Sequence, residues 1–239
     1  MDLSQKTVLI TGASGNIGRH LAAYFASRDA FVVLTGRDED RLQQAAAEMP
    51  ADRVMRVAAD LSEAASIRAL VDALHVRDRQ VDILINNAAD VTSKAFLESS
   101  FEEIDAQIRT NVVGALQLTR LLVPGMVEHG GGAIVNVSSL AGYKANPSQT
   151  VYSISKTAVN GMSEALRAEL GGKGIAVINV ALSSVALSGP VQGGQVPVAA
   201  IGPRLEQAIE QGETEIFFSA RTKWLMRLYA AFPGLKRLR

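Results

Sequence analysis

Tyr152 and Lys156 lie four residues apart in YSISK, inside a stretch (151–170) whose apolar periodicity predicts a helix. This spacing puts both side chains on one helical face. A tyrosine is a poor base at neutral pH because its pKa is about 10, but a neighbouring ammonium favours the phenolate. The pair could therefore exchange a proton with a substrate hydroxyl or carbonyl. Ser139, at the end of a predicted strand, could donate a hydrogen bond to the same oxygen.

A glycine-rich loop, TGASGNIG (11–18), follows an apolar run and precedes a predicted helix. The N–H groups and partial positive charge at the start of that helix could hold a phosphate. Gly12 allows a tight exit from the strand, Gly15 lets the backbone approach a pyrophosphate, and Gly18 lets the helix pack closely. We expect Asn16 to take a glycine-like position with positive φ, which Asn tolerates well. Ser14 and Ile17 complete the predicted cradle.

The second predicted strand ends in LTGRDEDR, where NAD-binding chains usually carry an acid for the ribose 2′-hydroxyl. Here Gly36 and Arg37 come first. A guanidinium suits a 2′-phosphate in charge and in geometry, and the Ser14 hydroxyl could join it. The sequence therefore favours NADP(H), with NAD(H) as the open alternative.

Short apolar runs alternate along the chain with amphipathic segments of helical length. The runs lack polar alternation, which is typical of strands buried on both faces of a parallel sheet. We predict strands at Thr7–Thr11, Phe31–Thr35, Val54–Ala59, Ile83–Asn86, Ala133–Val137, Ala176–Ala181 and Glu215–Phe218, and helices at 17–28, 39–48, 62–76, 101–129, 151–170 and 198–210. This order predicts one α/β domain, a doubly wound, Rossmann-like parallel sheet with helices on both faces.

The composition excludes several classes of function. The formal net charge is zero, which gives no general electrostatic case for nucleic acid. The chain has no cysteine, and its three histidines lack metal-ligand spacing, so we expect no metal site. The N-terminus enters a strand without the apolar region of a signal peptide, and no run reads as membrane-spanning. These features favour a cytoplasmic enzyme.

The order of motifs carries more information than any one of them. TGASGNIG is followed by NNAAD (86–90), RTNVVG (109–114), IVNVSS (134–139) and YSISK (152–156). From Lys6 to about Ala181 the chain resembles the short-chain dehydrogenase/reductase family. In that family the catalytic serine precedes the tyrosine by 13 residues, as Ser139 precedes Tyr152.

The resemblance implies a carbonyl–alcohol oxidoreductase and assigns roles to individual residues. Tyr152 would be the general acid/base, Ser139 would polarise the substrate oxygen, and Lys156 would lower the Tyr152 pKa and hold the nicotinamide ribose. Asn111 would support a water in a proton relay. The adenosine and nicotinamide contacts would come from Asp60, Leu61, Asn87, Ala88 and the backbone of Val185.

The sequence departs from the family pattern at three places. The middle glycine lies at position 15, where the short branch of the family has it at 16. Ser183 and Ser184 replace the Pro-Gly that usually follows the sixth strand. The third departure is the C-terminal tail, 221–239, which follows the cofactor-binding and catalytic domain at 1–220 and which we do not expect to be a separate domain. It carries six basic residues, no acid and an apolar stripe at helical spacing. Such a helix could pack on its own domain or in a dimer contact, or could touch a membrane surface.

The segment 184–203 is small, apolar and rich in glycine and proline, which favours an uncharged, apolar or lipid-like substrate. In relatives the helices around 101–129 and 151–170 form a dimer face, so the resemblance implies a homodimer or a higher homo-oligomer. Two alternatives stay open. One is an NADP(H)-binding sensor or scaffold without redox chemistry. The other is an epimerase or dehydratase of the same family.

Overall fold

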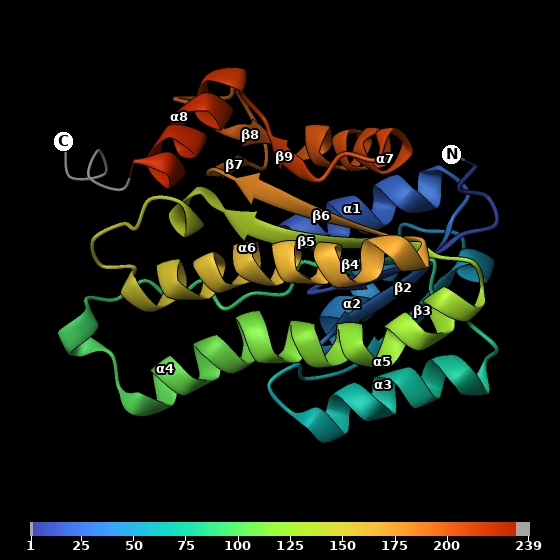
Figure 1. Ribbon diagram of the computed structural model, residues 1–239. Helices are drawn as coiled ribbons and strands as arrows, with labels where there is room; N and C mark the ends of the chain where they lie inside the picture. The colour runs from blue at the N-terminus through green and yellow to red at the C-terminus, as the bar shows by residue number, and fades with distance from the viewer. Residues whose placement is uncertain (1, 233–239) are drawn as a thin grey trace.

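The protein is built on one seven-stranded parallel sheet (Figure 1). The computed structural model describes residues 2–232. Strands run in the order β3-β2-β1-β4-β5-β6-β9, and every pairing is parallel. Their bounds are β1 Thr7–Thr11, β2 Phe31–Gly36, β3 Val54–Ala58, β4 Ile83–Asn86, β5 Gly132–Ser139, β6 Ile175–Leu182 and β9 Glu215–Phe217. A separate pair, β7 Val185–Ala186 and β8 Val196–Pro197, follows β6.

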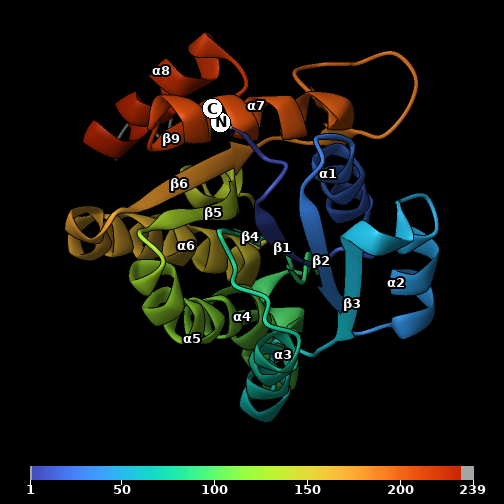
Figure 2. The ribbon, with the colours of Figure 1, turned by 90° about the vertical axis from the view of Figure 1, so that its right-hand side faces the viewer.

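Helices cover both faces of the sheet (Figure 2). Buried side chains of α1, α2 and α7 form one core with the sheet, and those of α3, α5 and α6 form a second core on the other face. The bounds are α1 Asn16–Ser27, α2 Glu39–Ala46, α3 Ala64–Val76, α4 Phe101–Ile108, α5 Ala115–Glu128, α6 Thr150–Leu170, α7 Ile201–Gln211 and α8 Ala220–Ala231.

The central strands are apolar on both faces because each face meets a layer of helices. In β1, Val8 and Ile10 belong to the first core, while Leu9 lies in the second. A strand with one face exposed to solvent would alternate apolar and polar residues instead. The predicted fold class is confirmed, with the predicted strands in place to within two residues at each end.

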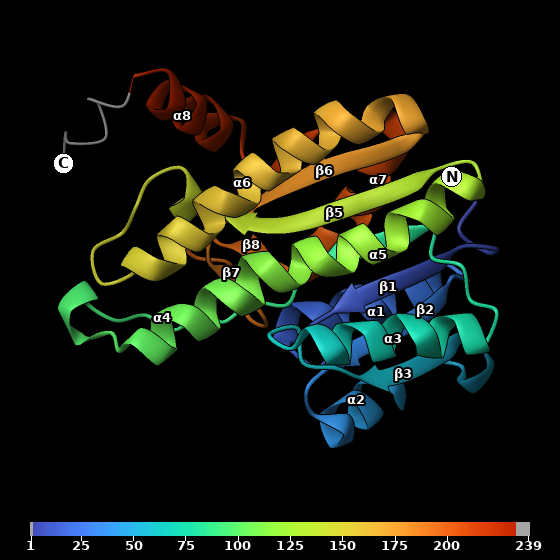
Figure 3. The ribbon, with the colours of Figure 1, turned by 60° about the horizontal axis from the view of Figure 1, so that its bottom comes forward.

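The stretch predicted as one helix from 101 to 129 is divided. A π-helical segment, Arg109–Gly114, joins α4 to α5 (Figure 3). The segment packs closely against the backbone of Leu61 at Gly114, because a Cβ at position 114 would lie 2.1 Å from the Leu61 carbonyl oxygen. Insertions of this kind are frequent at functional sites. Asn111 lies within this segment and is buried.

A row of three buried asparagines crosses the middle of the sheet. Asn86, Asn136 and Asn179 are paired in register on β4, β5 and β6. Asn86 donates to the Asn136 amide oxygen at 2.8 Å, and Asn136 donates to Ser163 on α6 at 2.9 Å. The row therefore ties three strands to the α6 side of the sheet.

The C-terminal helix α8 packs on its own domain. Met226 is 5% exposed and forms a small core with Ala181 and Phe217, against which Leu225 and Tyr229 also pack. Trp224 points away and is 66% exposed. Of the predicted stripe, Leu225 and Tyr229 thus pack within the chain, whereas Trp224 and Phe232 are largely exposed. The last three basic residues of the tail lie beyond the described residues. Between residues 2 and 232, no helix has the length and apolarity needed to cross a membrane.

Candidate active site

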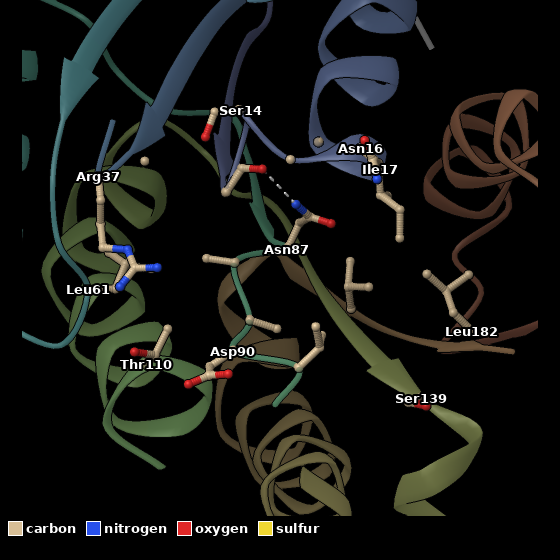
Figure 4. A pocket seen from close by; sticks show the side chains of 18 of the residues that line it. Ser14, Asn16, Ile17, Arg37, Leu61, Asn87, Asp90, Thr110, Ser139 and Leu182 are labelled. Atoms are coloured by element: carbon tan, nitrogen blue, oxygen red, sulfur yellow. Dashed lines mark hydrogen bonds between the residues drawn. The ribbon is translucent and has the colours of Figure 1, made fainter. Parts of the chain in front are cut away.

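A cleft of about 490 Å³ opens at the carboxyl ends of the parallel strands (Figure 4). This edge is where open α/β sheets bind ligands. Ser14 and Arg37 lie towards one end of the cleft, and Ser139 lies towards the other. Every site residue named from the sequence lines the cleft, except Asn111.

The glycine loop is shaped by close backbone approaches. Gly12 has φ +63°, and a Cβ there would lie 2.8 Å from the Ala88 Cα. A Cβ at Gly18 would lie 2.2 Å from the Gly12 carbonyl oxygen. The Asn87 amide closes the loop from the next strand, donating to the Thr11 carbonyl at 2.9 Å and to the Gly12 carbonyl at 3.3 Å. These contacts support the roles expected of Gly12 and Gly18.

The expectation that Asn16 takes a positive φ is wrong. Asn16 is the first residue of α1, and Gly15 is the N-cap with φ −81°. Gly12 alone supplies the left-handed turn in the loop, because the helix starts one residue after Gly15 and Asn16 needs only helical geometry. The loop nevertheless leaves the helix start open, since residues 14–18 all line the cleft.

The start of α1 can accept an anion. Its N-cap makes no side-chain hydrogen bond, and its first turn contains no acid. The first N–H groups of a helix have no intrahelical partner. A pyrophosphate over Gly15–Gly18 would satisfy them and would meet the positive end of the helix dipole. The residues present therefore fit a dinucleotide cofactor.

The far end of the cleft carries two cationic side chains. Arg37 and Arg41 both line it, and Arg41 donates to the Ser14 carbonyl at 3.2 Å. Asp38 is engaged elsewhere, because its carboxylate caps α2 by accepting from the Arg41 N–H at 3.0 Å. A Cβ at Gly36 would lie 3.1 Å from the Ser14 hydroxyl. An acid at position 36 would crowd Ser14.

At the opposite end, Ser139, Tyr152 and Lys156 line the cleft together. Lys156 is 3% exposed, and its ammonium donates to the Val137 carbonyl at 2.8 Å. Burial lowers the pKa of Lys156 to about 8. Its nitrogen lies 5.7 Å from the centre of the Tyr152 ring.

The resemblance predicts that Lys156 lowers the Tyr152 pKa, but the structure gives a raised pKa for Tyr152. Burial raises the pKa of Tyr152, and the hydrogen bond with the Ser139 hydroxyl acts in the opposite direction. The Lys156 ammonium is directed to Val137. The hydrogen bond with Ser139 is thus the contribution that favours the phenolate.

Asn111 lies behind the cleft wall. Its amide oxygen accepts from the Asp90 N–H at 2.6 Å, and its amide nitrogen donates to the Asp90 carbonyl at 2.9 Å and to the Ser155 hydroxyl at 3.0 Å. Asn111 therefore fixes the loop after β4 and ties it to α6. The relay role that the resemblance implies stays a prediction.

The turn after β6 holds together without Pro-Gly. Neither Ser183 nor Ser184 has a positive φ, so the backbone there is accessible to any residue. The Ser183 hydroxyl donates to the Gly194 carbonyl at 2.8 Å, and the Ser184 carbonyl accepts from the Val196 N–H at 2.9 Å. These bonds place Val185 on the cleft wall.

Several lining residues were missed by the sequence analysis: Arg41, Asp90, Thr110 and Ser138. A signal existed for Arg41, which is the second arginine of LTGRDEDR and follows Arg37 by four residues. Asp90 and Thr110 carried no such signal, because the cleft wall there depends on how Asn111 packs.

Comparison with known proteins agrees with this geometry. Residues 6–191 match the family model described as short chain dehydrogenase. The ketoacyl reductase HetN of Nostoc is 36% identical over 78% of this chain and 66% of its own length. A short-chain dehydrogenase of Sphingobium yanoikuyae in complex with NADPH has a TM-score of 0.82 at 28% identity, over 98% of this chain and 97% of that one. A short chain dehydrogenase/reductase of Burkholderia phymatum in complex with NAD has a TM-score of 0.88 at 25% identity, over 99% and 97% of the two chains.

A parallel sheet with a glycine loop and a Ser–Tyr–Lys set at its carboxyl edge defines a nicotinamide-dependent oxidoreductase. The chain belongs to the short-chain dehydrogenase/reductase family. Its neighbours include complexes with NADPH and with NAD.

Proposed function

We propose that this chain is an NADP(H)-dependent enzyme that interconverts a carbonyl and an alcohol on a small, apolar or lipid-like substrate. One observation carries the proposal. A single cleft has Ser139, Tyr152 and Lys156 at one end and Arg37, Arg41 and Ser14 at the other. Proton-transfer groups and a phosphate-binding end thus lie along one elongated site.

The choice of NADP(H) rests on charge. Arg37 and Arg41 can pair with a 2′-phosphate, which suits guanidinium geometry. Asp38 does not line the cleft, and one of its carboxylate oxygens caps α2. NAD(H) would leave both guanidinium groups without an anionic partner.

When bound, the nicotinamide supplies hydride chemistry, while the protein binds, orients and moves the proton. Ser139 donates a hydrogen bond to the substrate oxygen and so stabilises the negative charge that develops on a carbonyl during reduction. The Tyr152 phenol donates its proton to that oxygen, and in the reverse direction it accepts the alcohol proton. Lys156 would hold the nicotinamide ribose. Val185 would face the carboxamide.

The loop segment that follows β6 is largely apolar. Leu187 and Val191 are exposed on the loop after β7, and the segment 184–203 contains no arginine or lysine. A charged carboxylate or phosphate on the substrate would find no partner there. An uncharged ketone, aldehyde or alcohol fits this surface. The Nostoc relative is named a ketoacyl reductase, and a ketoacyl group contains a carbonyl of this class.

The test is a panel of ketones, aldehydes and alcohols followed by NADPH absorbance, with Tyr152→Phe and Tyr24→Phe in parallel. Loss of general acid/base catalysis should lower kcat/KM by about 100-fold or more in Tyr152→Phe. Tyr24→Phe should retain activity, because Tyr24 lies outside the cleft. Turnover that survives in Tyr152→Phe would refute the role given to Tyr152. A product formed with no net change in NADPH would indicate the epimerase or dehydratase alternative.

A further inference from the structure

A connected set of polar side chains runs from behind Ser139 to the C-terminal helix. The Ser138 hydroxyl donates to the Asn160 amide oxygen at 2.6 Å. Asn179 donates to that same oxygen at 3.0 Å and to the Tyr143 hydroxyl at 2.9 Å. Tyr143 donates onward to Glu215 at 2.6 Å, and Arg227 of α8 reaches the other Glu215 oxygen at 3.4 Å.

Tyr143 is the central member of this set. Its hydroxyl accepts from Asn179 and donates to Glu215, so both of its hydrogen-bonding functions are used. Burial and the bond to Glu215 raise the pKa of Tyr143, which keeps the hydroxyl protonated as a donor. Tyr143 is not among the residues that line the cleft.

Apolar contacts also hold the ring of Tyr143, in addition to the hydrogen bonds of its hydroxyl. The ring centres of Tyr143 and Phe217 are 5.3 Å apart. Leu140 and Tyr143 both pack against the core that contains Met226 of α8. The turn after β5 is therefore held between α6 and the β9–α8 segment, where Figures 1 and 3 place α8 beside it.

The same turn carries Ser139. A 3₁₀ turn, Leu140–Gly142, joins Ser139 to Tyr143, and the Ala141 N–H donates to the Ser139 hydroxyl at 3.2 Å. The turn has little room to move, because a Cβ at Gly142 would lie 2.7 Å from the Lys156 carbonyl oxygen. A shift of Tyr143 would be passed to Ser139 through this short, hydrogen-bonded stretch.

We propose that Tyr143 is a positioning residue of the active site. Held by Glu215 and Asn179, it fixes the turn in which Ser139 offers its hydroxyl to Tyr152 and to the substrate oxygen. The effect on turnover rests on the proposed function, whereas the effect on Tyr152 concerns the protein alone. The C-terminal segment 215–232 is thereby coupled to the reaction centre.

The first test measures the Tyr152 pKa directly, by NMR of the tyrosine Cζ carbons in protein labelled with ¹³C-tyrosine. Four tyrosines are present, so each signal can be assigned by single substitution. Because the bond with Ser139 favours the phenolate, Tyr143→Phe should raise the Tyr152 pKa by about half a unit or more. In the same variant, the backbone amides of Ala141 and of residue 143 should also exchange faster with solvent. An unchanged Tyr152 pKa, or unchanged amide exchange, would overturn the proposal.

Tyr24→Phe is the matched control. Tyr24 donates to Glu206, which is paired with Arg28, so the substitution removes the same kind of bond from a Tyr–Glu–Arg cluster outside the cleft. It should lower stability to a similar degree and leave the Tyr152 pKa unchanged. If Tyr24→Phe moved that pKa as much as Tyr143→Phe, the effect would be general destabilisation and the proposal would be wrong.

The second test is a double-substitution cycle in kcat/KM with a ketone that the enzyme turns over. Tyr143→Phe should lower kcat/KM by about 5- to 30-fold, the factor for one buried hydrogen bond, with little change in the KM for NADPH. In a Ser139→Ala background the same substitution should change kcat/KM by less than about twofold, because its effect passes through Ser139. An equal factor in both backgrounds would overturn the proposal. A wild-type protein without turnover would count against the proposed function, while the NMR result would still decide the role of Tyr143.

Discussion

The Lys156 ammonium donates a hydrogen bond to the carbonyl oxygen of Val137 at 2.8 Å. This bond joins α6 to β5 two residues before Ser139, and thereby ties the lysine and the serine of the site to one piece of backbone. It also holds a cation that is only 3% exposed in the wall of the cleft.

A buried lysine should cost stability at neutral pH. Its pKa is about 8 in the folded protein against 10.5 ordinarily, so below pH 8 both states are protonated and the folded state bears the full cost. As pH rises from 8 to 10.5 the folded protein releases the proton first, and the cost disappears. Lys156→Met should therefore raise the free energy of unfolding by about 1–3 kcal/mol at pH 7. Urea denaturation at pH 7 and pH 10 checks this, and a gain of the same size at both pH values would contradict it.

Cofactor preference should depend on Arg37. Arg37→Asp should lower the NADPH-to-NADH ratio of binding constants by about 10-fold or more, because a carboxylate repels the 2′-phosphate and accepts from a ribose hydroxyl. Fluorescence titration with both cofactors measures the ratio without any substrate. The control is Arg77→Asp, an exposed site at the end of α3. If the unaltered protein bound NADH as tightly as NADPH, or more tightly, the proposed preference for NADP(H) would be wrong.

The glycine loop should tolerate no side chain at position 18. In Gly18→Ala the new Cβ meets the Gly12 carbonyl oxygen, so the loop must shift, and NADPH affinity should fall by about 10-fold or more. Gly161→Ala is the matched control, since Gly161 lies within α6 with open space around it. That change should raise the free energy of unfolding by about 0.5–1 kcal/mol. Unaltered NADPH affinity in Gly18→Ala would mean that the loop is not the phosphate cradle.

Most of the fold could be predicted from the sequence because the strands are buried on both faces. A short apolar run such as VLI, followed by a glycine loop and a helical segment, is typical of a parallel strand buried on both faces. The site followed from the order of its motifs, since parallel strands deliver their carboxyl ends to one edge.

Three features could not be predicted, each for a physical reason. The conformation of Asn16 depends on where α1 begins, and glycine spacing alone does not fix that residue. The direction of the Tyr152 pKa depends on burial, which only the packed cleft determines. The π-helical segment depends on the contact between Gly114 and Leu61, which lie on elements far apart in the sequence.

The C-terminal helix should contribute to stability through one face. Met226→Asp places a carboxylate in a small apolar core and should lower the free energy of unfolding by about 2–4 kcal/mol. Trp224→Ser, on the exposed face, should change it by less than about 0.5 kcal/mol. Thermal denaturation compares the two. Co-sedimentation of the full chain with anionic vesicles addresses the membrane alternative, and binding that is lost in Trp224→Ser would support it.

The asparagine row across β4, β5 and β6 has a consequence for how the chain reaches its native state. A slip of one residue in any of these strands would turn its asparagine towards the opposite core, to which these three strands contribute apolar side chains. The amide would lose its partners there, at a cost of about 1–3 kcal/mol for each buried polar group left unpaired. Asn86, Asn136 and Asn179 should thus disfavour shifted pairings among strands whose valine and isoleucine side chains would otherwise accept them.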